Sequence, residues 1–502
     1  MDEIRALQLG GMDWNVIFHV PDYVDLSCYD YFIDVPKKPY DVVFVNKTLL
    51  KEEIANLMKA SKAYTVFVTE NANMTDGMTH FMKCRCAKKL ANSEIQNFFD
   101  NEIRDYFGAP YGEKFSFRNL GVNHNFKGNV VWNGNHDVTF QGDFSEEMKQ
   151  IAFWKNTIPF MSGQTLDFWI EYQKKGNVEI EFRMYLFQRG DASSNYQKEW
   201  IFKEDALDDI ITVTNEYADG PLFISIYAKG EGELSLTAVH DRHSRRGKGY
   251  FLPGGERLVT KNREEVFFYF DPGDMKPPLN VYFSGYKTRQ GFEGYNMLKK
   301  MGCPFLLISE PRLEGGSFYM GSEEYETMIY HAVEGYMQRL GMTGDEVIFS
   351  GLSMGTYGAL YYGCDIRPHA LILGKPLASI GNVAGNETLG RPGGFPTSLD
   401  VLMFLSGNTT EEAKEELNQR FWKKFDATNW QDTKFVVSYM IEDDYDGSAY
   451  QDLIRNLKDP GVSIYGKGIH GRHNDNSDAI VSWFLSQYEK ILEEDFGRKA
   501  CE

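Results

Sequence analysis

The sequence has few cysteines, an excess of acidic over basic residues and no long apolar run. Only six cysteines occur in 502 residues, which suits a reducing compartment better than a disulfide framework. The formal net charge of -19 argues against general binding to nucleic acid or to an anionic membrane, because both need a basic surface. No apolar run approaches the ~20 residues that span a bilayer. We expect no signal peptide, because the first residues form neither a basic nor an apolar region.

Sequence motifs for nucleotides and metals are also missing. The α/β start of the chain has no G-x-G-x-x-G and no G-x-x-x-x-G-K-[ST]. Cys84 and Cys86 have the wrong spacing for a zinc knuckle and no second pair of ligands nearby, so we expect no metal and no other cofactor. One basic segment, DRHSRRGKG around Arg245 and Arg246, interrupts the acidic trend. We interpret it as a solvated loop.

Hydrophobic patterning predicts a multidomain α/β protein with three parts. Residues 1–130 are expected to form a small α/β domain, residues 131–252 a β-sandwich-like domain and residues 253–502 an α/β-hydrolase-like domain. In the first part, the runs DVVFVN (41–46) and YTVFVTE (64–70) are typical of strands covered on both faces. Helical spacing between the two runs indicates a strand–helix–strand unit.

The middle part has the two-residue period of half-buried strands. From Val178 to Leu186 apolar and charged residues alternate strictly. The segment PLFISIYAKGEGELSLTAV (221–239) is interpreted as two strands around a glycine-rich turn. Sandwiches of this kind often bind sugars, and Trp169 or Tyr196 could stack on them, but ordinary core and edge aromatics are the favoured explanation.

The third part contains GLSMGTYG (351–358), which fits G-x-S-x-G. The buried run EVIFSG enters Ser353, and TYGALYYG starts a helix after it. In such a turn the serine stands above the carboxyl edge of a sheet, where it can act as a nucleophile. A glycine-rich and then helical stretch at about 377–430 is expected to form a cap over this site.

A serine nucleophile needs a base, and the base needs an orienting carboxylate. In this fold the acid and then the histidine follow the serine along the chain. The segment SYMIEDDYDG offers carboxylates just past a strand, and we favour Asp443, with Glu442 and Asp444 as alternatives. SIYGKGIHGRHNDNSD offers His473, which we favour because it lies nearer the start of the last helix, and His470.

A tetrahedral intermediate at Ser353 needs an oxyanion hole with two backbone donors. The first is the N–H of Met354, directly after the serine. The second is expected in the loop after the strand NVYFSGY, around Gly285 and Tyr286. A simple glycine turn is the alternative explanation of that loop.

The segments FSGLSMGTYGALYYG, SYMIEDDYDGSAYQDLIRNL and GIHGRHNDN resemble the family of the second accessory Sec proteins of Gram-positive cocci. The resemblance extends over the whole chain. It implies a Ser–acid–His triad with the serine at Ser353, the histidine at His473 and the acid at or beside Asp443. The family pattern has a Glu as the acid, and Glu442 lies next to Asp443, so the acid stays open between them.

The resemblance also implies a cytoplasmic function. Members of that family work with two sister accessory proteins and a SecA2-type motor to export glycosylated serine-rich-repeat adhesins, and they O-acetylate N-acetylglucosamine on the adhesin. The acetyl donor is not implied. The alternatives are a carbohydrate or acyl esterase, because an acyl-serine can also be transferred to water, and a non-catalytic scaffold of the export complex.

Overall fold

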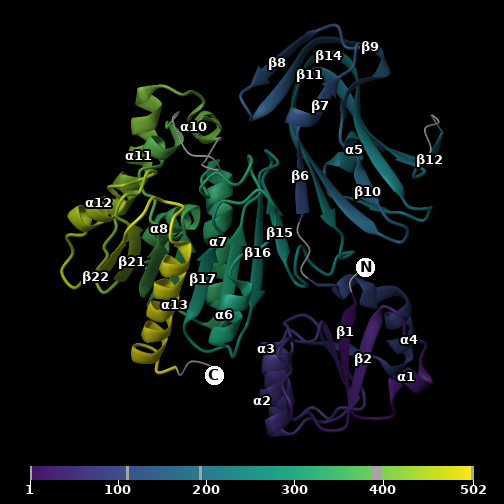
Figure 1. The fold of residues 1–502 in the computed structure, drawn as a ribbon, viewed down its shortest axis with the longest axis vertical. Coiled ribbons are helices and arrows are strands. Elements are labelled where there is room, and N and C mark those ends of the chain that lie inside the picture. Colours follow the sequence, from purple (N-terminus) through teal and green to yellow (C-terminus); the bar gives the residue numbers. More distant parts are fainter. Residues whose placement is uncertain (1–2, 109–111, 191–194, 387–396, 499–502) are drawn as a thin grey trace.

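The chain forms three sheets, each with its own hydrophobic core (Figure 1). The structure is a computed structural model, and it describes residues 3–108, 112–190, 195–386 and 397–498. The first and third sheets are mostly parallel and covered by helices, whereas the middle sheet is antiparallel. The predicted multidomain α/β architecture is therefore confirmed.

The N-terminal sheet is parallel, with strand order β2-β1-β3-β4-β5. Its strands are β1 (Ile4–Leu9), β2 (Val24–Tyr29), β3 (Val42–Val45), β4 (Val66–Thr69) and β5 (Lys88–Leu90). Its helices are α1 (Trp14–Ile17), α2 (Lys51–Ala60), α3 (Asp76–Cys84) and α4 (Ile95–Asn97). Every residue of β3 and β4 is buried, because helices cover both faces of the sheet. The predicted strand–helix–strand unit is thus β3, α2 and β4.

The middle sheet is built on three very long strands. Its strands are β6 (Gly112–Ser116), β7 (Leu120–Val122), β8 (Asn129–Asn133), β9 (Asp137–Trp154), β10 (Ile158–Phe160), β11 (Thr165–Phe187), β12 (Tyr196–Lys203), β13 (Ile211–Thr214) and β14 (Gly220–His243), with helix α5 (Glu204–Leu207). The predicted alternation in β11 is confirmed, because Val178, Ile180, Phe182, Met184 and Leu186 are all buried.

The glycine-rich stretch in this sheet is a bend within one strand, and the predicted turn between two strands is wrong. Gly176 of β11 pairs with Gly232 of β14, and both have positive φ angles. A Cβ at Gly232 would lie 2.1 Å from the Lys175 carbonyl oxygen. Because only glycine fits here, both strands run on through the bend. Residues from both halves then share one core, so the sheet folds into a sandwich-like unit.

For the middle part, the predicted boundary needs correction, whereas the favoured explanation of Trp169 as a core aromatic is confirmed. The middle sheet already begins at Gly112, because β6 pairs with β14, so the predicted boundary at 130 lies inside it. Trp169 is buried, with the guanidinium groups of Arg257 and Arg263 over its ring at 4.1 and 3.9 Å. Its ring is therefore a core aromatic, whereas Tyr196 is exposed.

The C-terminal sheet has eight strands in the order β15-β16-β18-β17-β19-β20-β21-β22. They are β15 (Glu256–Val259), β16 (Glu265–Asp271), β17 (Leu279–Phe283), β18 (Phe305–Ser309), β19 (Val347–Leu352), β20 (Ala370–Gly374), β21 (Lys434–Met440) and β22 (Ser463–Ile469). Only β16 runs against its neighbours. The helices are α6 (Tyr295–Met301), α7 (Glu323–Leu340), α8 (Met354–Ile366), α9 (Ile380–Ala384), α10 (Ser398–Ser406), α11 (Glu411–Asp426), α12 (Ala449–Asn456) and α13 (Ser477–Glu494).

The stretch proposed as a cap, residues 377–430, contains α9, α10 and α11. Residues 387–396 lie outside the described residues. Helix α11 packs on α8, which begins directly after Ser353, and α9 and α10 pack on α11. In Figure 1, α10 and α11 lie at the upper left end of the C-terminal domain.

A buried network of charges joins the middle sheet to the C-terminal sheet. The Arg242 guanidinium donates to both carboxylate oxygens of Glu265, at 2.8 and 2.6 Å, and to Gln290. The Gln290 amide contacts His240, whose other ring nitrogen lies 2.6 Å from Glu171. Fully paired buried charges of this kind fix the relative position of the two parts they join.

The basic segment around Arg245 is a joint between domains, and its interpretation as a solvated loop is wrong. Arg245 is buried and donates to the backbone carbonyl oxygens of Asp105 and Phe251, at 2.7 and 2.9 Å. Arg246 binds the Asp105 carboxylate at 2.8 Å, and Lys248 binds Glu102 at 2.5 Å. The segment thus follows the middle sheet and holds the end of the N-terminal domain.

We predict that Arg245→Ala destabilises this joint far more than Lys248→Ala does. The first change leaves buried carbonyl groups without donors, at a cost of about 2–4 kcal/mol in the free energy of unfolding. The second removes a partly exposed ion pair, worth about 0–1 kcal/mol. Urea denaturation and limited proteolysis near residue 108 measure the difference. Equal midpoints for the two variants would contradict the assigned role of Arg245.

Candidate active site

The turn at Ser353 joins the end of β19 to the start of α8. Ser353 has φ 52° and ψ -121°, a strained conformation for a residue with a side chain. A Cβ at Gly351 would lie 2.3 Å from the backbone of Gly355, and a Cβ at Gly355 would lie 2.0 Å from the Phe283 carbonyl oxygen. The two glycines of the motif therefore let the chain turn tightly and let α8 pack against β17.

His473 lies against Ser353, although 120 residues separate them in the chain. Its Nε2 lies 2.7 Å from the Ser353 Oγ, and the histidine side chain is 1% exposed. His473 lies in the loop after β22, and its backbone N–H donates to Asp444 in the loop after β21 at 2.9 Å. This hydrogen bond holds the histidine in place. The Tyr445 ring stacks on the imidazole, with centroids 4.3 Å apart and planes 4° apart. The imidazole is thereby fixed in orientation.

The Asp443 carboxylate binds the other side of this imidazole. Its Oδ2 lies 2.9 Å from the His473 Nδ1, and its Oδ1 accepts from the backbone N–H groups of Tyr445 and Asp446 at 2.8 and 3.2 Å. Burial works against ionisation, but the interactions with His473 and the two N–H groups outweigh it and lower the pKa of Asp443. Asp443 is therefore a carboxylate at neutral pH.

The other candidates from the sequence have different contacts. The Glu442 carboxylate pairs with His470 at 2.9 Å, and both side chains are at least half exposed. Asp444 accepts from the His473 backbone, and the buried Asp446 accepts from the N–H groups of Ala378 and Ser379 in the cap segment. The structure brings Ser353, His473 and Asp443 together and keeps Glu442 and His470 apart as a separate pair. The catalytic roles themselves stay predictions.

The two loops predicted to form an oxyanion hole begin next to each other. The Met354 N–H opens α8, directly after the serine. The Gly285 N–H, however, donates to the Glu293 carboxylate at 2.8 Å, so in this conformation it is directed away from an oxyanion. The Tyr286 N–H, one residue later, stays our prediction for the second donor. Burial raises the pKa of the Tyr286 phenol to about 12, so the hydroxyl stays protonated.

One cluster in the described part of the chain has the spacing of a metal site, but its contacts do not fit one. Ligand atoms of Glu171, His240 and Glu265 lie within 4.8 Å of one another. The guanidinium groups of Arg242 and Arg257 already pair with Glu265, at 2.6 and 2.5 Å. Two arginines at the same carboxylate supply the positive charge that a metal ion would bring.

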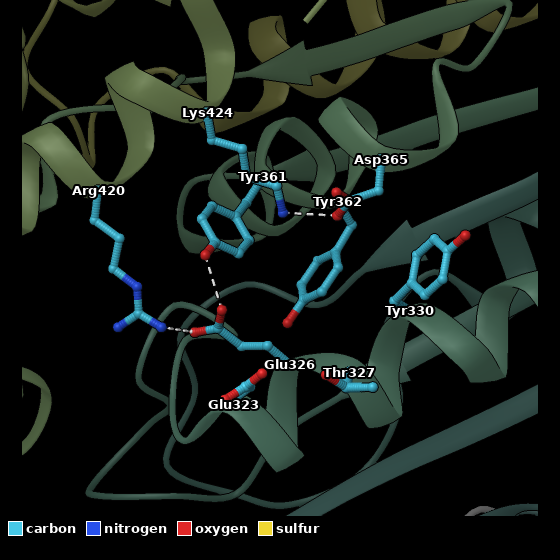
Figure 2. A pocket seen from close by; sticks show the side chains of 9 residues that line it. All are labelled: Glu323, Glu326, Thr327, Tyr330, Tyr361, Tyr362, Asp365, Arg420 and Lys424. Carbon is cyan, nitrogen blue, oxygen red and sulfur yellow. Dashed lines mark hydrogen bonds and ion pairs between the residues drawn. The ribbon is translucent and has the colours of Figure 1, made fainter. Parts of the chain in front are cut away.

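A cavity of about 590 Å³ lies between α7, α8 and α11, at the end of α8 that is far from Ser353 (Figure 2). The Glu326 carboxylate accepts from Tyr361 at 2.8 Å and pairs with Arg420. Lys424 pairs with Asp365 at 2.6 Å. Arg420 and Lys424, the two basic side chains that line the cavity, thus each pair with a carboxylate that also lines it. These pairs connect the cap helix α11 to α7 and α8.

Two residues near the triad are missing from the sequence-based predictions. Tyr445 is the one residue without a carboxylate in the run 442–446, and that contrast is a signal that could have drawn attention to it. Lys375, at φ 57°, follows β20, and its ammonium group donates to Ser477 at 3.2 Å. Burial lowers the pKa of Lys375, while the charge of Asp443 partly offsets this. No sequence pattern marks it.

The eight strands follow the order of α/β-hydrolase-type proteins. As in that class, the serine (Ser353) follows the fifth strand, the acid (Asp443) the seventh and the histidine (His473) the eighth. The C-terminal part of this chain falls in that class. Its family is narrower. The family model described as Asp2: Accessory Sec system GspB-transporter matches residues 4–498, and the chain belongs to this family.

Similar proteins cover the chain from end to end. The chain is 37% identical to an accessory Sec system protein Asp2 of Staphylococcus aureus, over 99% of this chain and 98% of the relative. It is 35% identical to one of Streptococcus gordonii, over 99% of both. A chain in the solved Glycosylation Associate Protein (Gap123) complex of Streptococcus agalactiae matches with a TM-score of 0.86 and 34% identity, over 99% of both chains.

Among the helices of the described ranges, none combines the length and the apolar character needed to cross a bilayer.

We predict that Asp443→Asn lowers acyl transfer from an activated acetyl ester by about 10²–10⁴-fold, because the amide leaves the imidazole poorly oriented. Glu442→Gln is the matched control, since it changes an adjacent and exposed carboxylate, and we expect less than about a threefold effect. Burst kinetics with each purified variant make the comparison. A larger loss in Glu442→Gln would assign the acid to Glu442.

Proposed function

We propose that this protein is a component of an accessory Sec export system that also O-acetylates N-acetylglucosamine on the exported adhesin. Family membership supports the export role. The relay from Ser353 through His473 to Asp443 on a strained turn supports the acetyl-transfer role, and it is the observation that carries the proposal. All three side chains needed for an acyl-serine mechanism are present and in contact.

In the first step the Ser353 Oγ attacks the acetyl carbonyl of an activated ester or thioester, and His473 Nε2 takes the hydroxyl proton. Asp443 stabilises the imidazolium that forms. The N–H groups of Met354 and Tyr286 would stabilise the tetrahedral oxyanion. The intermediate collapses when the leaving group departs with the proton from His473, and an acetyl-serine remains.

In the second step a sugar hydroxyl replaces the leaving group. His473 takes its proton, the sugar oxygen attacks the acetyl-serine, and collapse returns the proton to Ser353. The products are an acetylated sugar and the free enzyme. With water as the nucleophile the same steps give acetate, and the protein is then an esterase. Which acceptor reacts depends on how the closed site positions the sugar and excludes water.

The partners follow from the family and not from the site. The solved relative from Streptococcus agalactiae comes from a complex, which supports association of this chain with two sister accessory proteins. A SecA2-type motor and a glycosylated serine-rich-repeat adhesin complete the proposed cytoplasmic system. The net charge of -19 disfavours nucleic acid as a further partner.

We predict that Ser353→Ala abolishes acetylation of the adhesin glycans, with a loss of about 10⁴-fold or more in transfer rate. The matched control is Ser486→Ala, on the exposed face of α13, which should transfer acetyl groups like the wild type. Mass spectrometry of the adhesin glycans gives the readout. Normal acetylation by folded Ser353→Ala protein would overturn the enzymatic part of the proposal, and release of free acetate without sugar acetylation would favour the esterase.

We also predict that Ser353→Ala leaves export intact. Loss of one hydroxyl changes almost no interface area, whereas a stable interface buries about 1,600 Å² in total. Cells with Ser353→Ala should therefore export adhesin with under-acetylated sugars, whereas cells without the protein should not export it. A secretion assay compares the two. An export defect in Ser353→Ala as complete as that of the deletion would show that the two roles are not separable.

A further inference from the structure

The N-terminal domain exposes more large apolar side chains than either of the other two domains does within the described ranges. Nine of the twenty large apolar side chains that are exposed in the described ranges occur before residue 75. We call this set the apolar edge; it consists of Met12, Val16, Ile17, Tyr29, Tyr31, Ile33, Val35, Leu50 and Met74. Their exposed fractions run from 39% for Val35 to 82% for Val16.

These residues lie at one edge of the N-terminal sheet because the sheet is parallel. They follow β1, β2, β3 and β4, which are adjacent strands in the order β2-β1-β3-β4. In a parallel sheet the carboxyl ends of all strands meet at the same edge. Residues from four separate segments therefore gather at the same edge of the N-terminal domain.

The apolar edge faces away from the rest of the molecule. The N-terminal domain contacts the other domains through its opposite edge, where Arg85 precedes β5 and donates to the Gly273 carbonyl oxygen at 2.9 Å. Tyr64, which precedes β4, packs on Tyr269. In Figure 1, β1 begins beside the other two domains, at the mark N, and runs away from them. Neither the middle domain nor the C-terminal domain covers the edge.

The area matches that of a protein interface. At about 200 Å² for a fully exposed large side chain, these exposures amount to roughly 1,000 Å², compared with about 800 Å² per partner in a standard interface. The largest apolar patch on a typical monomer is about 300–600 Å². A surface of this size is therefore expected to be covered in the functional assembly.

A small ligand does not fit this edge, although parallel sheets often bind one where the strand order reverses. The order reverses here between β1 and β3, and the protein's own polar side chains fill that position. The Gln8 amide donates to the carbonyl oxygens of Gly10 and Met12, at 2.9 and 2.8 Å. Asn46 accepts from Thr69 at 2.7 Å, and a Cβ on Gly11 would lie 2.3 Å from the Asn46 amide nitrogen.

The charges among the apolar side chains narrow the choice of partner. The loops 10–17 and 29–35 contain Asp13, Asp30 and Asp34 and no lysine or arginine, and all three aspartates are exposed. In the segment after β3, the Lys47 ammonium lies over the Tyr31 ring at 4.4 Å and pairs with Glu53 at 2.8 Å. An anionic bilayer would be repelled by the three aspartates. In a twofold contact with a second copy, the same carboxylates would face each other across the interface. A partner surface with an apolar centre and a basic rim is complementary.

We propose that the apolar edge is the docking surface for a sister accessory protein that presents such an apolar centre with a basic rim. This inference rests on the proposed partnership, but not on the proposed chemistry, because the edge lies in a different domain from Ser353. The N-terminal domain would then bind the partner protein, and the C-terminal domain would act on the glycan.

The test compares two double variants of the full-length protein, each produced together with the sister accessory proteins. Val16→Asp with Ile33→Asp places carboxylates in the apolar edge, and Ile201→Asp with Ile454→Asp makes the same change at side chains of 46% and 44% exposure in the other domains. We expect the edge variant to bind its partner at least about 100-fold more weakly, which is about 2.7 kcal/mol, and the control to change by less than about threefold. Ile33→Leu should keep the affinity.

Circular dichroism spectra and urea denaturation of the full-length protein, which report on all domains and do not depend on Ser353, show that each variant is folded, and they should be equal in both. Equal partner binding by the edge variant and the wild type would overturn the surface assignment while the partnership stands. A wild-type protein that binds no sister protein would overturn the partnership and this inference together. Self-association of the wild type that the edge variant loses, or binding of the wild type to phosphatidylglycerol vesicles, would replace the sister protein with another occupant.

Discussion

The contact between α8 and β17 sets the geometry of the candidate site. At Gly355 the helix lies so close to the strand that a Cβ would be 2.0 Å from the Phe283 carbonyl oxygen. The nucleophile and the Met354 N–H precede this contact on the helix, and the loop of Gly285 and Tyr286 follows it from the strand. One close approach therefore positions Ser353 relative to both proposed donor loops, which explains why the motif needs its second glycine.

Local patterns predicted those parts of the fold that depend on neighbouring residues. The buried runs at β3 and β4, the alternation in β11 and the strand–turn–helix at Ser353 each follow from a few consecutive side chains. The bend in β11 and β14 did not, because it depends on Gly176 and Gly232 meeting across two strands. Glycine clusters in sequence look the same whether they end a strand or bend it.

For the candidate site, the sequence favoured Asp443 and His473 as partners of Ser353 but left Glu442, Asp444 and His470 open. Strand order predicted which loops supply the acid and the histidine, but not which carboxylate points toward the imidazole. That direction depends on the loop after β21, where backbone N–H groups hold the Asp443 carboxylate. The role of Arg245 was missed because burial of an arginine depends on distant carbonyl groups, and a basic run in sequence carries no sign of them.

The Arg245 joint has a consequence for synthesis of the chain on the ribosome. The carbonyl group of Asp105 emerges 140 residues before the arginine that binds it. At about 5–20 residues per second, the N-terminal domain would fold roughly 7–28 seconds before the joint can form. During that interval it is tethered but not docked. The N-terminal domain is thus the first folded part of the nascent chain that other molecules can contact, and its orientation relative to the later domains is not yet fixed.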